Sequence, residues 1–126
     1  MTMRTPLGRV RGLGSAKEGV GHWWMQRLTA VALVPLLLWF VASLVQLAGA
    51  DYAHVVAWIG RLPVAVLLCL LFVAGFYHLS LGLQVVIEDY VRREPCRIVA
   101  LVLVRFGCWA LAVTALFSVL KIAFRG

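Results

Sequence analysis

Charged side chains are scarce in this sequence: they make up 13% of its 126 residues, while 63% of the residues are hydrophobic. A soluble domain of this size needs roughly a quarter of charged residues to cover its surface. The composition therefore nearly excludes a soluble globular domain, and the length limits the chain to a single domain, residues 1–126. Internal repeats and low-complexity tracts are also absent from the sequence.

The three cysteines form no recognisable motif. Cys69 and Cys108 lie in apolar stretches, and Cys96 lies in a short polar segment between two such stretches. Their spacing excludes a zinc knuckle, a redox pair and a covalent haem attachment. We expect them to serve as small buried hydrophobic residues.

Three long apolar stretches dominate the chain. Residues 28–50 and 62–87 contain no Lys, Arg, Asp or Glu, and residues 98–120 contain a single one, Arg105. A spanning helix needs about 20 apolar residues, and backbone polar groups in lipid must be satisfied within their own segment. The sequence therefore predicts an all-α membrane protein with three transmembrane helices, near 25–48, 64–90 and 98–122.

Turn-forming residues support these boundaries. Gly49 and Asp51 predict the end of the first helix, and Pro63 suits the first turn of the second. Pro35 lies inside the first helix and should kink it. The glycine-rich residues 1–21 are expected to form an irregular arm.

The first apolar stretch has a rival interpretation as a cleaved signal peptide. Ala48-Gly49-Ala50 resembles a small-residue cleavage site. However, the hydrophobic region of a signal peptide has roughly 7–15 residues, and this run has 23. We therefore expect it to remain as a spanning helix.

Lysine and arginine are distributed unevenly around the three stretches. Five lie before or at the start of the first stretch and three lie between the second and the third: Arg4, Arg9, Arg11, Lys17, Arg27, Arg92, Arg93 and Arg97. The loop between the first two stretches holds only Arg61. The positive-inside rule places the N-terminus, and the arm over residues 1–21, in the cytoplasm and the C-terminus outside. Because the basic residues flank spans and form no single patch, the net charge of +7 does not indicate nucleic-acid binding.

His78 is an ionisable residue deep inside the second predicted helix. Such residues are costly in a membrane and mark candidate functional sites. His78 lies 10 residues before Glu88, which puts it about 15 Å deep, near the middle of a bilayer core of about 30 Å. A neutral imidazole at this depth requires a hydrogen-bond partner or a metal, and histidine is a common axial ligand of haem iron.

Two glycines share a helix face with His78. Gly75 precedes it by three residues and Gly82 follows it by four. This face could admit a flat macrocycle, or it could allow close packing of a neighbouring helix that hydrogen-bonds His78; the spacing leaves both open. If haem binds, its second ligand must come from another chain, because His22 lies at the edge of the first helix and His54 lies in the first loop.

An acid and a phenol end the second predicted helix. Asp89 follows His78 by 11 residues, almost three full turns, so both lie on one stripe that reaches the cytoplasmic surface. Tyr90 follows directly, and its hydroxyl can donate and accept. This arrangement suits a lipid-soluble redox carrier, with the phenol bonded to a quinone carbonyl and the acid passing protons. The alternative is that Glu88 and Asp89 only end the helix and that Tyr90 belongs to an aromatic belt.

Two arginines lie near the cytoplasmic ends of helices. Arg27 opens the first helix, and Arg105 lies about two turns into the third. Arginine near a helix end commonly extends its guanidinium to the interface. Either side chain could instead pair with an anionic group such as a haem propionate.

Several of these residues occur in the order found in a known family. The segment from His22 to Arg27 (His-Trp-Trp-Met-Gln-Arg) opens the first helix, and Phe76 to Tyr90 contains His78 with ten residues between it and Asp89. This pattern resembles the hydrophobic membrane anchor subunits of succinate dehydrogenase, respiratory complex II, over nearly the whole chain. Residues 14–20 and 119–124 resemble the alphaproteobacterial or mitochondrial-like branch. The resemblance implies the bacterial inner membrane, ahead of the mitochondrial inner membrane.

The resemblance also implies partners and residue roles. A second three-helix anchor subunit completes a heterodimeric bundle that holds one haem b and docks an iron–sulfur subunit and a flavoprotein. His78 is implied as an axial ligand of the haem iron. Arg27, together with His22, is implied near the haem propionates. Tyr90 is implied as a contact of the quinone carbonyl, with Asp89 beside it.

The expected function is that of a non-catalytic anchor that completes a succinate:quinone oxidoreductase. Electrons from succinate would then reduce ubiquinone on the cytoplasmic side, while the flavin and iron–sulfur chemistry lies on other chains. The alternative is a small three-helix membrane transporter or assembly subunit in which His78 is structural. A reduced-minus-oxidised visible spectrum of the purified complex discriminates best, because haem b absorption supports the anchor.

Overall fold

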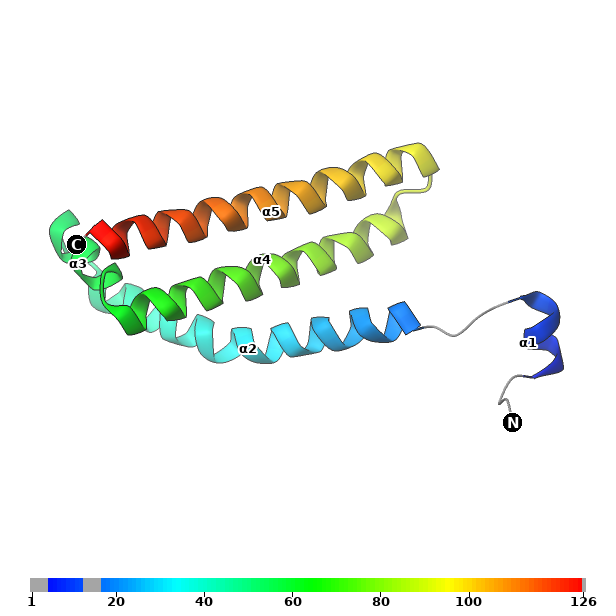
Figure 1. Cartoon of the computed structure of the whole chain (residues 1–126), viewed down its shortest axis with the longest axis horizontal. Coiled ribbons are helices and arrows are strands. Elements are labelled where there is room, and N and C mark those ends of the chain that lie inside the picture. Colours follow the sequence, from blue (N-terminus) through cyan, green and yellow to red (C-terminus); the bar gives the residue numbers. More distant parts are fainter. Residues whose placement is uncertain (1–4, 13–16, 126) are drawn as a thin grey trace.

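The computed structural model describes residues 5–12 and 17–125, and in these residues all regular secondary structure is helical. The helices in chain order are α1 (Pro6–Arg11), α2 (Lys17–Leu47), α3 (Tyr52–Ile59), α4 (Leu62–Tyr90) and α5 (Glu94–Arg125). The three long helices lie side by side with α4 between α2 and α5, and α4 contacts both (Figure 1). Within α2, α4 and α5, the segments Val20–Leu47, Leu62–Tyr90 and Glu94–Arg125 are long and apolar enough to cross a membrane. The predicted all-α fold with three spanning helices is confirmed.

The two ends of this helix layer are distinct. At one end, which we call the α3 end, α3 contacts α4 and α5 (Figure 1). At the other end, which we call the turn end, Val91–Arg93 connect the last residue of α4, Tyr90, to the first residue of α5, Glu94. The N-terminal part of α2 also lies at the turn end (Figure 1).

The residues expected to delimit the helices do so. Gly49 follows α2 with a φ of +82°, a left-handed conformation that glycine adopts without a steric penalty. Pro63 lies in the first turn of α4, where its missing N–H would have no helical partner anyway. Pro35 lies inside α2, and the ribbon of α2 bends along its length in Figure 1.

The helices are longer than the apolar stretches indicate. α2 begins at Lys17 instead of near residue 25, and α5 extends three to four residues beyond 98–122 at each end. Hydropathy marks the part of a helix that suits lipid, but extending an existing helix gains one hydrogen bond per residue without a new nucleus. The expectation of an irregular arm over 1–21 is wrong for residues 6–11 and 17–21, which are helical; its residues 1–4 and 13–16 lie outside the described ones. Residues 17–21 extend α2, whereas residues 6–11 form the separate helix α1.

Helix α3 was not predicted, because the segment was interpreted as the first loop. Asp51 precedes α3 in an extended conformation, and its carboxylate accepts a hydrogen bond of 2.9 Å from the backbone N–H of His54. This is N-terminal capping, which satisfies one of the free N–H groups of the first turn. An aspartate before a mostly apolar segment was therefore the overlooked signal.

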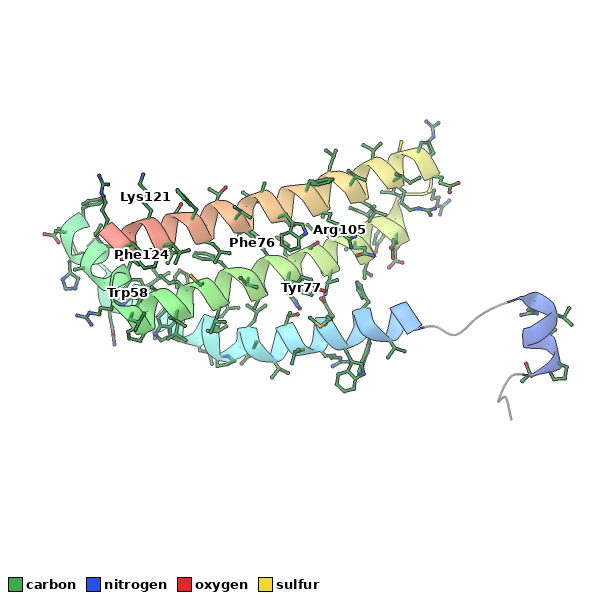
Figure 2. The ribbon with its side chains drawn as sticks, viewed as in Figure 1. Trp58, Phe76, Tyr77, Arg105, Lys121 and Phe124 are labelled. Carbon is green, nitrogen blue, oxygen red and sulfur yellow. The ribbon has the colours of Figure 1, made fainter. Side chains whose placement is uncertain are left out.

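Most buried apolar side chains lie towards the α3 end. They form one cluster from α2, α4 and α5: Leu33, Val64, Ala65, Leu68, Leu71 and Val119. Trp39 of α2 stacks on Trp58 of α3 beside this cluster, with 5.9 Å between the ring centroids; Figure 2 shows Trp58 at this end, with Lys121 and Phe124 of α5. Large apolar side chains elsewhere on the long helices are mostly exposed. Such an apolar exterior suits helices that are surrounded by lipid.

The cysteines differ in burial. Cys108 is buried and Cys69 is half-buried, which fits small hydrophobic residues in the layer. Cys96 is exposed in the first turn of α5, so the expectation of burial is wrong for it. Cys96 thus differs from the two cysteines of the apolar stretches, since it lies in the polar start of α5.

Candidate functional site

His78 lies in the middle of α4 and is half-buried against α2. Its Nδ1 atom is 3.1 Å from the Oγ1 atom of Thr29, a residue of α2 that is only 8% exposed. Its Nε2 atom makes no hydrogen bond with any of the described residues. The imidazole therefore has one nitrogen bound to the neighbouring helix and one available to a ligand.

The face of α2 that meets α4 carries three polar residues. His22, Gln26, Thr29 and Leu33 are spaced by four, three and four residues, which puts them on one side of the helix. A Cβ atom at Gly82 would lie 3.8 Å from Nε2 of Gln26, and one at Gly75 would lie 3.9 Å from Cδ2 of Leu33. Both glycines thus face side chains of α2, one on each side of the contact between His78 and Thr29.

These contacts correspond to one of the two interpretations that the glycine spacing left open, close helix packing with a hydrogen-bonded histidine. At each glycine the contact within 4 Å is with a single side-chain atom of α2. The nearest atoms to both glycines are the ends of long side chains at ordinary contact distance, and no backbone atom of α2 lies within 4 Å of either Cβ position. Gly75 and Gly82 therefore leave the surroundings of the His78 ring free of bulk on their own helix.

Two polar atoms in the same interface lack partners among the residues that the structure describes. Nε2 of His22 and Oε1 of Gln26 are buried and make no hydrogen bond within residues 5–12 and 17–125. Leaving a buried polar group unpaired costs about 1–3 kcal/mol. Within the described residues the interface between α2 and α4 at the turn end is therefore incomplete, whereas the apolar cluster towards the α3 end requires no polar partner.

Arg27 is on a different side of α2 from this polar face. It is exposed, and its guanidinium carbon lies 5.2 Å from the ring centroid of Trp23, a cation–π contact. Trp23 and Trp24 are both exposed and meet edge to face at 5.1 Å. The structure thus places Arg27 little more than one turn from His22 on α2 but does not bring Arg27 to His78.

Asp89 and Tyr90 are the last two residues of α4, at the turn end. Both are exposed, and Tyr90 is 80% exposed. They lie 11 and 12 residues beyond His78, which is about 16–18 Å along the helix. The preceding acid, Glu88, accepts a hydrogen bond of 3.1 Å from Gln84. Asp89 and Tyr90 therefore form a separate polar surface at the turn end, away from His78, and this surface is open to another chain or to a ligand.

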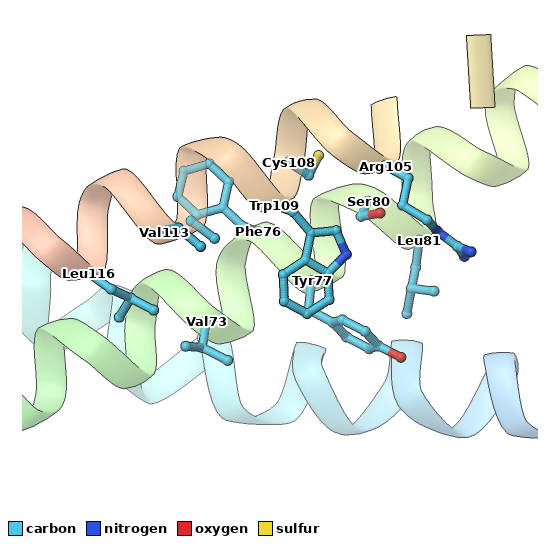
Figure 3. Close-up of a pocket in the computed structure, with 11 residues that line it drawn as sticks. Val73, Phe76, Tyr77, Ser80, Leu81, Arg105, Cys108, Trp109, Val113 and Leu116 are labelled. Atoms are coloured by element: carbon cyan, nitrogen blue, oxygen red, sulfur yellow. The ribbon is translucent and has the colours of Figure 1, made fainter. Parts of the chain in front are cut away.

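Arg105 lines a cavity on the side of α4 that faces α5, whereas His78 faces α2. The cavity has a volume of about 290 Å³ and lies between α4 and α5. Figure 3 shows Arg105, Tyr77 and Trp109 among its lining residues. The rest of the lining is mainly apolar. Because His78 bonds to α2, Arg105 and His78 belong to different surfaces of the layer.

The described residues provide no complete metal site. No group of three or more His, Cys, Asp or Glu side chains occurs in residues 5–12 and 17–125 that could hold a metal ion. His22 precedes Thr29 by seven residues, about 10 Å along α2, and His54 lies on α3 at the opposite end. Neither of the other two histidines therefore lies at the level of His78.

Thr29 and Gln26 were not among the residues predicted from the sequence. Thr29 is a polar residue inside the first apolar run, and Gln26 lies just before that run. Both share a helix face with His22. A search for polar residues of spanning helices on the face of a predicted site residue would have found them. Which of them meets His78 depends on the pairing of α2 with α4, which periodicity does not specify.

A layer of three long apolar helices with a histidine in the middle of the central one defines a multi-pass membrane protein. The family described as succinate dehydrogenase/fumarate reductase transmembrane subunit matches residues 1–114. The chain belongs to this family, among the hydrophobic membrane anchor subunits of succinate dehydrogenase.

Curated relatives support this assignment over most of the chain. The succinate dehydrogenase hydrophobic membrane anchor subunit of Rickettsia bellii is 32% identical over 120 residues, covering 94% of this chain and 87% of the relative. That of Paracoccus denitrificans is 30% identical over 117 residues, covering 93% and 90%. The succinate dehydrogenase membrane anchor subunit of Reclinomonas americana is 32% identical over 92 residues, covering 71% and 77%. No solved structure matches the chain.

Proposed function

We propose that this anchor subunit supplies one axial ligand, His78, to a haem b that it shares with a second anchor subunit. The observation that carries the proposal is the imidazole at mid-span of α4, half-buried and with its Nε2 atom free of hydrogen bonds within the described residues. Neutral imidazole nitrogen is a standard ligand of haem iron. When bound, the haem would supply a one-electron redox centre within the membrane.

The residues around His78 fit this group. Gly75 and Gly82 keep side-chain bulk away from the ring on its own helix, as a flat macrocycle requires. The second axial ligand comes from the second anchor subunit in this proposal, because His22 and His54 lie far from His78 along the fold. The unpaired Nε2 of His22 and Oε1 of Gln26 are polar groups that a partner chain, a propionate or water would satisfy.

Arg27 and His22 are the proposed neighbours of the haem propionates. Both lie at the turn end of α2, and the Arg27 guanidinium is exposed beside Trp23. A guanidinium binds carboxylates through two parallel hydrogen bonds. In this proposal the Arg27 guanidinium binds the carboxylate while it keeps its contact with the ring of Trp23.

The turn end is the proposed position of the quinone site. The hydroxyl of Tyr90 would donate a hydrogen bond to a carbonyl oxygen of ubiquinone, and the carboxylate of Asp89 would pass protons from water. The exposure of both residues at the end of α4 supports this role, because a site shared with the iron–sulfur subunit must be open on this chain. The iron–sulfur subunit and the flavoprotein would dock on the same side and deliver electrons from succinate.

The orientation follows from the same proposal. The turn end lies in the cytoplasm and the α3 end outside the bacterial inner membrane, in agreement with the excess of lysine and arginine around the turn end. A reporter fused after Gly126 tests this directly and is expected to be periplasmic. A cytoplasmic reporter would contradict the orientation and the position of the quinone site.

The purified complex tests the haem assignment. A reduced-minus-oxidised visible spectrum is expected to show the absorption bands of haem b in proportion to the flavin content of the complex. A complex that contains all its subunits and reduces quinone but lacks these bands would contradict the assignment. His78 would then be a structural residue that packs α2 against α4.

A further inference from the structure

We propose that Thr29 is a positioning residue for His78: its hydroxyl oxygen accepts the Nδ1–H proton of the imidazole, which fixes the tautomer in which Nε2 is unprotonated. This inference rests on the proposed ligation of haem by His78. It adds a role for α2 in this site that goes beyond close packing. Thr29 contributes no ligand itself; it determines which nitrogen of His78 presents a lone pair.

The Thr29 hydroxyl carries a single proton. Its Oγ1 lies 2.7 Å from the backbone carbonyl oxygen of Met25 and 3.1 Å from that of Gln26. Carbonyl oxygens only accept, so each of these contacts is a hydrogen bond only when the hydroxyl proton points back into the helix. The distance to Met25 is the shortest hydrogen bond of this hydroxyl and matches the usual length for O–H···O.

The contact with His78 must then use the other hydrogen-bonding capacity of the hydroxyl. With its proton directed at Met25, Oγ1 presents only lone pairs to Nδ1 at 3.1 Å. A hydrogen bond therefore forms only if Nδ1 carries the hydrogen and donates it to Thr29. In a neutral imidazole one nitrogen is protonated and the other is not, so Nε2 keeps its lone pair.

Thr29 is held firmly enough to impose this choice. It is only 8% exposed in the interface between α2 and α4. Its β-branched side chain has few rotamers in a helix, and its hydroxyl is bonded to the preceding turn. The reverse arrangement, with Thr29 donating to Nδ1, would withdraw the hydroxyl proton from both carbonyl contacts and would leave Nε2 protonated and unable to bind a metal.

The same hydrogen bond affects the electronic properties of the ligand. An imidazole that donates its remote N–H to an acceptor becomes more basic at the metal-binding nitrogen and is held in one orientation. A more basic ligand favours the oxidised iron. Removing the acceptor at position 29 is therefore expected to weaken haem binding and to raise the reduction potential of the bound haem.

Three variants of the complex test this proposal. Thr29→Val keeps the shape of the side chain and deletes the acceptor, and Thr29→Ser keeps the hydroxyl. Thr114→Val is the matched control, because Thr114 on α5 makes the same type of bond of 2.7 Å to the carbonyl of Ala110 and has no contact with His78. The readouts are the haem-to-flavin ratio, the haem reduction potential and the co-purification of all subunits.

The expected results distinguish the contribution of the Thr29 hydroxyl from that of the shape of the side chain. Thr29→Val should lower haem affinity roughly 10–100-fold, the usual effect of losing such a partner. In the haem that remains, the ratio of reduced to oxidised iron at a fixed potential should rise by up to about tenfold, a shift of about 59 mV for one electron. Thr29→Ser and Thr114→Val should match the unaltered complex in both readouts.

Three outcomes would overturn the inference. One is a Thr29→Val complex with unchanged haem content and potential. Another is equal damage in Thr29→Ser and Thr29→Val, which would show that the methyl packing matters and the hydroxyl does not. Because Thr29→Val could block assembly, the third measurement uses the unaltered full chain in lipid, with histidine labelled by nitrogen-15. The His78 signal, identified by its loss in His78→Gln, should show protonated Nδ1, and protonated Nε2 would contradict the proposal. Absence of haem from the unaltered complex would instead contradict the proposed function.

Discussion

The α3 end and the turn end of the helix layer are packed in different ways. Towards the α3 end, six buried apolar residues from three helices form a continuous cluster, and Trp39 and Trp58 stack beside it. Towards the turn end, the interface between α2 and α4 contains His22, Gln26, Thr29 and His78, and two of its buried polar atoms have no partner in the described part of the chain.

This difference separates two tasks within one small subunit. The apolar cluster is satisfied by contacts within the chain, so it can hold the three long helices together. The polar interface is costly until another chain or a ligand completes it. We therefore expect substitutions near the α3 end to affect stability and substitutions towards the turn end to affect what the subunit binds.

The largest effect is expected for His78→Leu. This change removes the proposed iron ligand, so the complex should lose the haem b bands in its reduced-minus-oxidised spectrum. His54→Leu is the control, because His54 is an exposed residue of α3 whose backbone N–H, and not its ring, bonds to Asp51. An unaltered haem spectrum in His78→Leu would refute the assignment of the ligand.

The second effect concerns the apolar cluster. Leu68 is 3% exposed at its centre, and Leu68→Ala should destabilise the chain by about 2–5 kcal/mol through a cavity. Thermal unfolding of the complex in detergent measures the loss, and Leu70→Ala on the exposed side of α4 is the control. Complexes that do assemble should keep an unaltered haem spectrum. A changed haem spectrum with unchanged stability would contradict the assignment of stability to the α3 end and of binding to the turn end.

The third effect concerns the glycine beside Gln26. A Cβ at Gly82 meets only Nε2 of Gln26 at 3.8 Å, so Gly82→Ala should be tolerated. Gly82→Leu should push against α2 and cost about 1–3 kcal/mol by overpacking, with loss of haem and of assembled complex. Gly107→Leu is the control, because nothing lies within 4 Å of a Cβ there. Equal assembly of both leucine variants, measured by co-purification, would show that the face of Gly82 is not restricted.

The smallest effect is expected at Tyr90 and Asp89. Tyr90→Phe keeps the ring and deletes a hydrogen bond of roughly 1 kcal/mol, which should weaken quinone reduction several-fold. Asp89→Asn should slow proton delivery and change quinone affinity less. Steady-state quinone reduction measures both, and succinate oxidation with an artificial acceptor upstream of the quinone should be unchanged. If both variants reduce quinone at the unaltered rate, the alternative interpretation holds: Asp89 only ends the helix, and Tyr90 belongs to an aromatic belt.

The elements that could be predicted from the sequence are those set by local chemistry. Apolar runs of 23 and 26 residues indicate spanning helices wherever they occur, and Gly49 and Pro63 mark boundaries through their own backbone preferences. Helix α3 was missed although Asp51 carried its signal, because the same aspartate also suits the end of the preceding helix. The polar extensions of α2 and α5 were missed because a helix continues beyond the residues that require lipid.

The sequence by itself determined the three apolar spans, the place of His78 near the middle of the second one and the family of the subunit, because each depends on residue type and spacing along one chain. The tertiary structure alone decided that His78 meets Thr29, that Gly75 and Gly82 face Leu33 and Gln26, and that Arg105 lines a cavity on the other side of α4. Periodicity assigns residues to a face of a helix, but it does not say which face of the next helix lies opposite. That pairing depends on how the side chains of α2, α4 and α5 fit together in three dimensions, and it determines which nitrogen of His78 is left free.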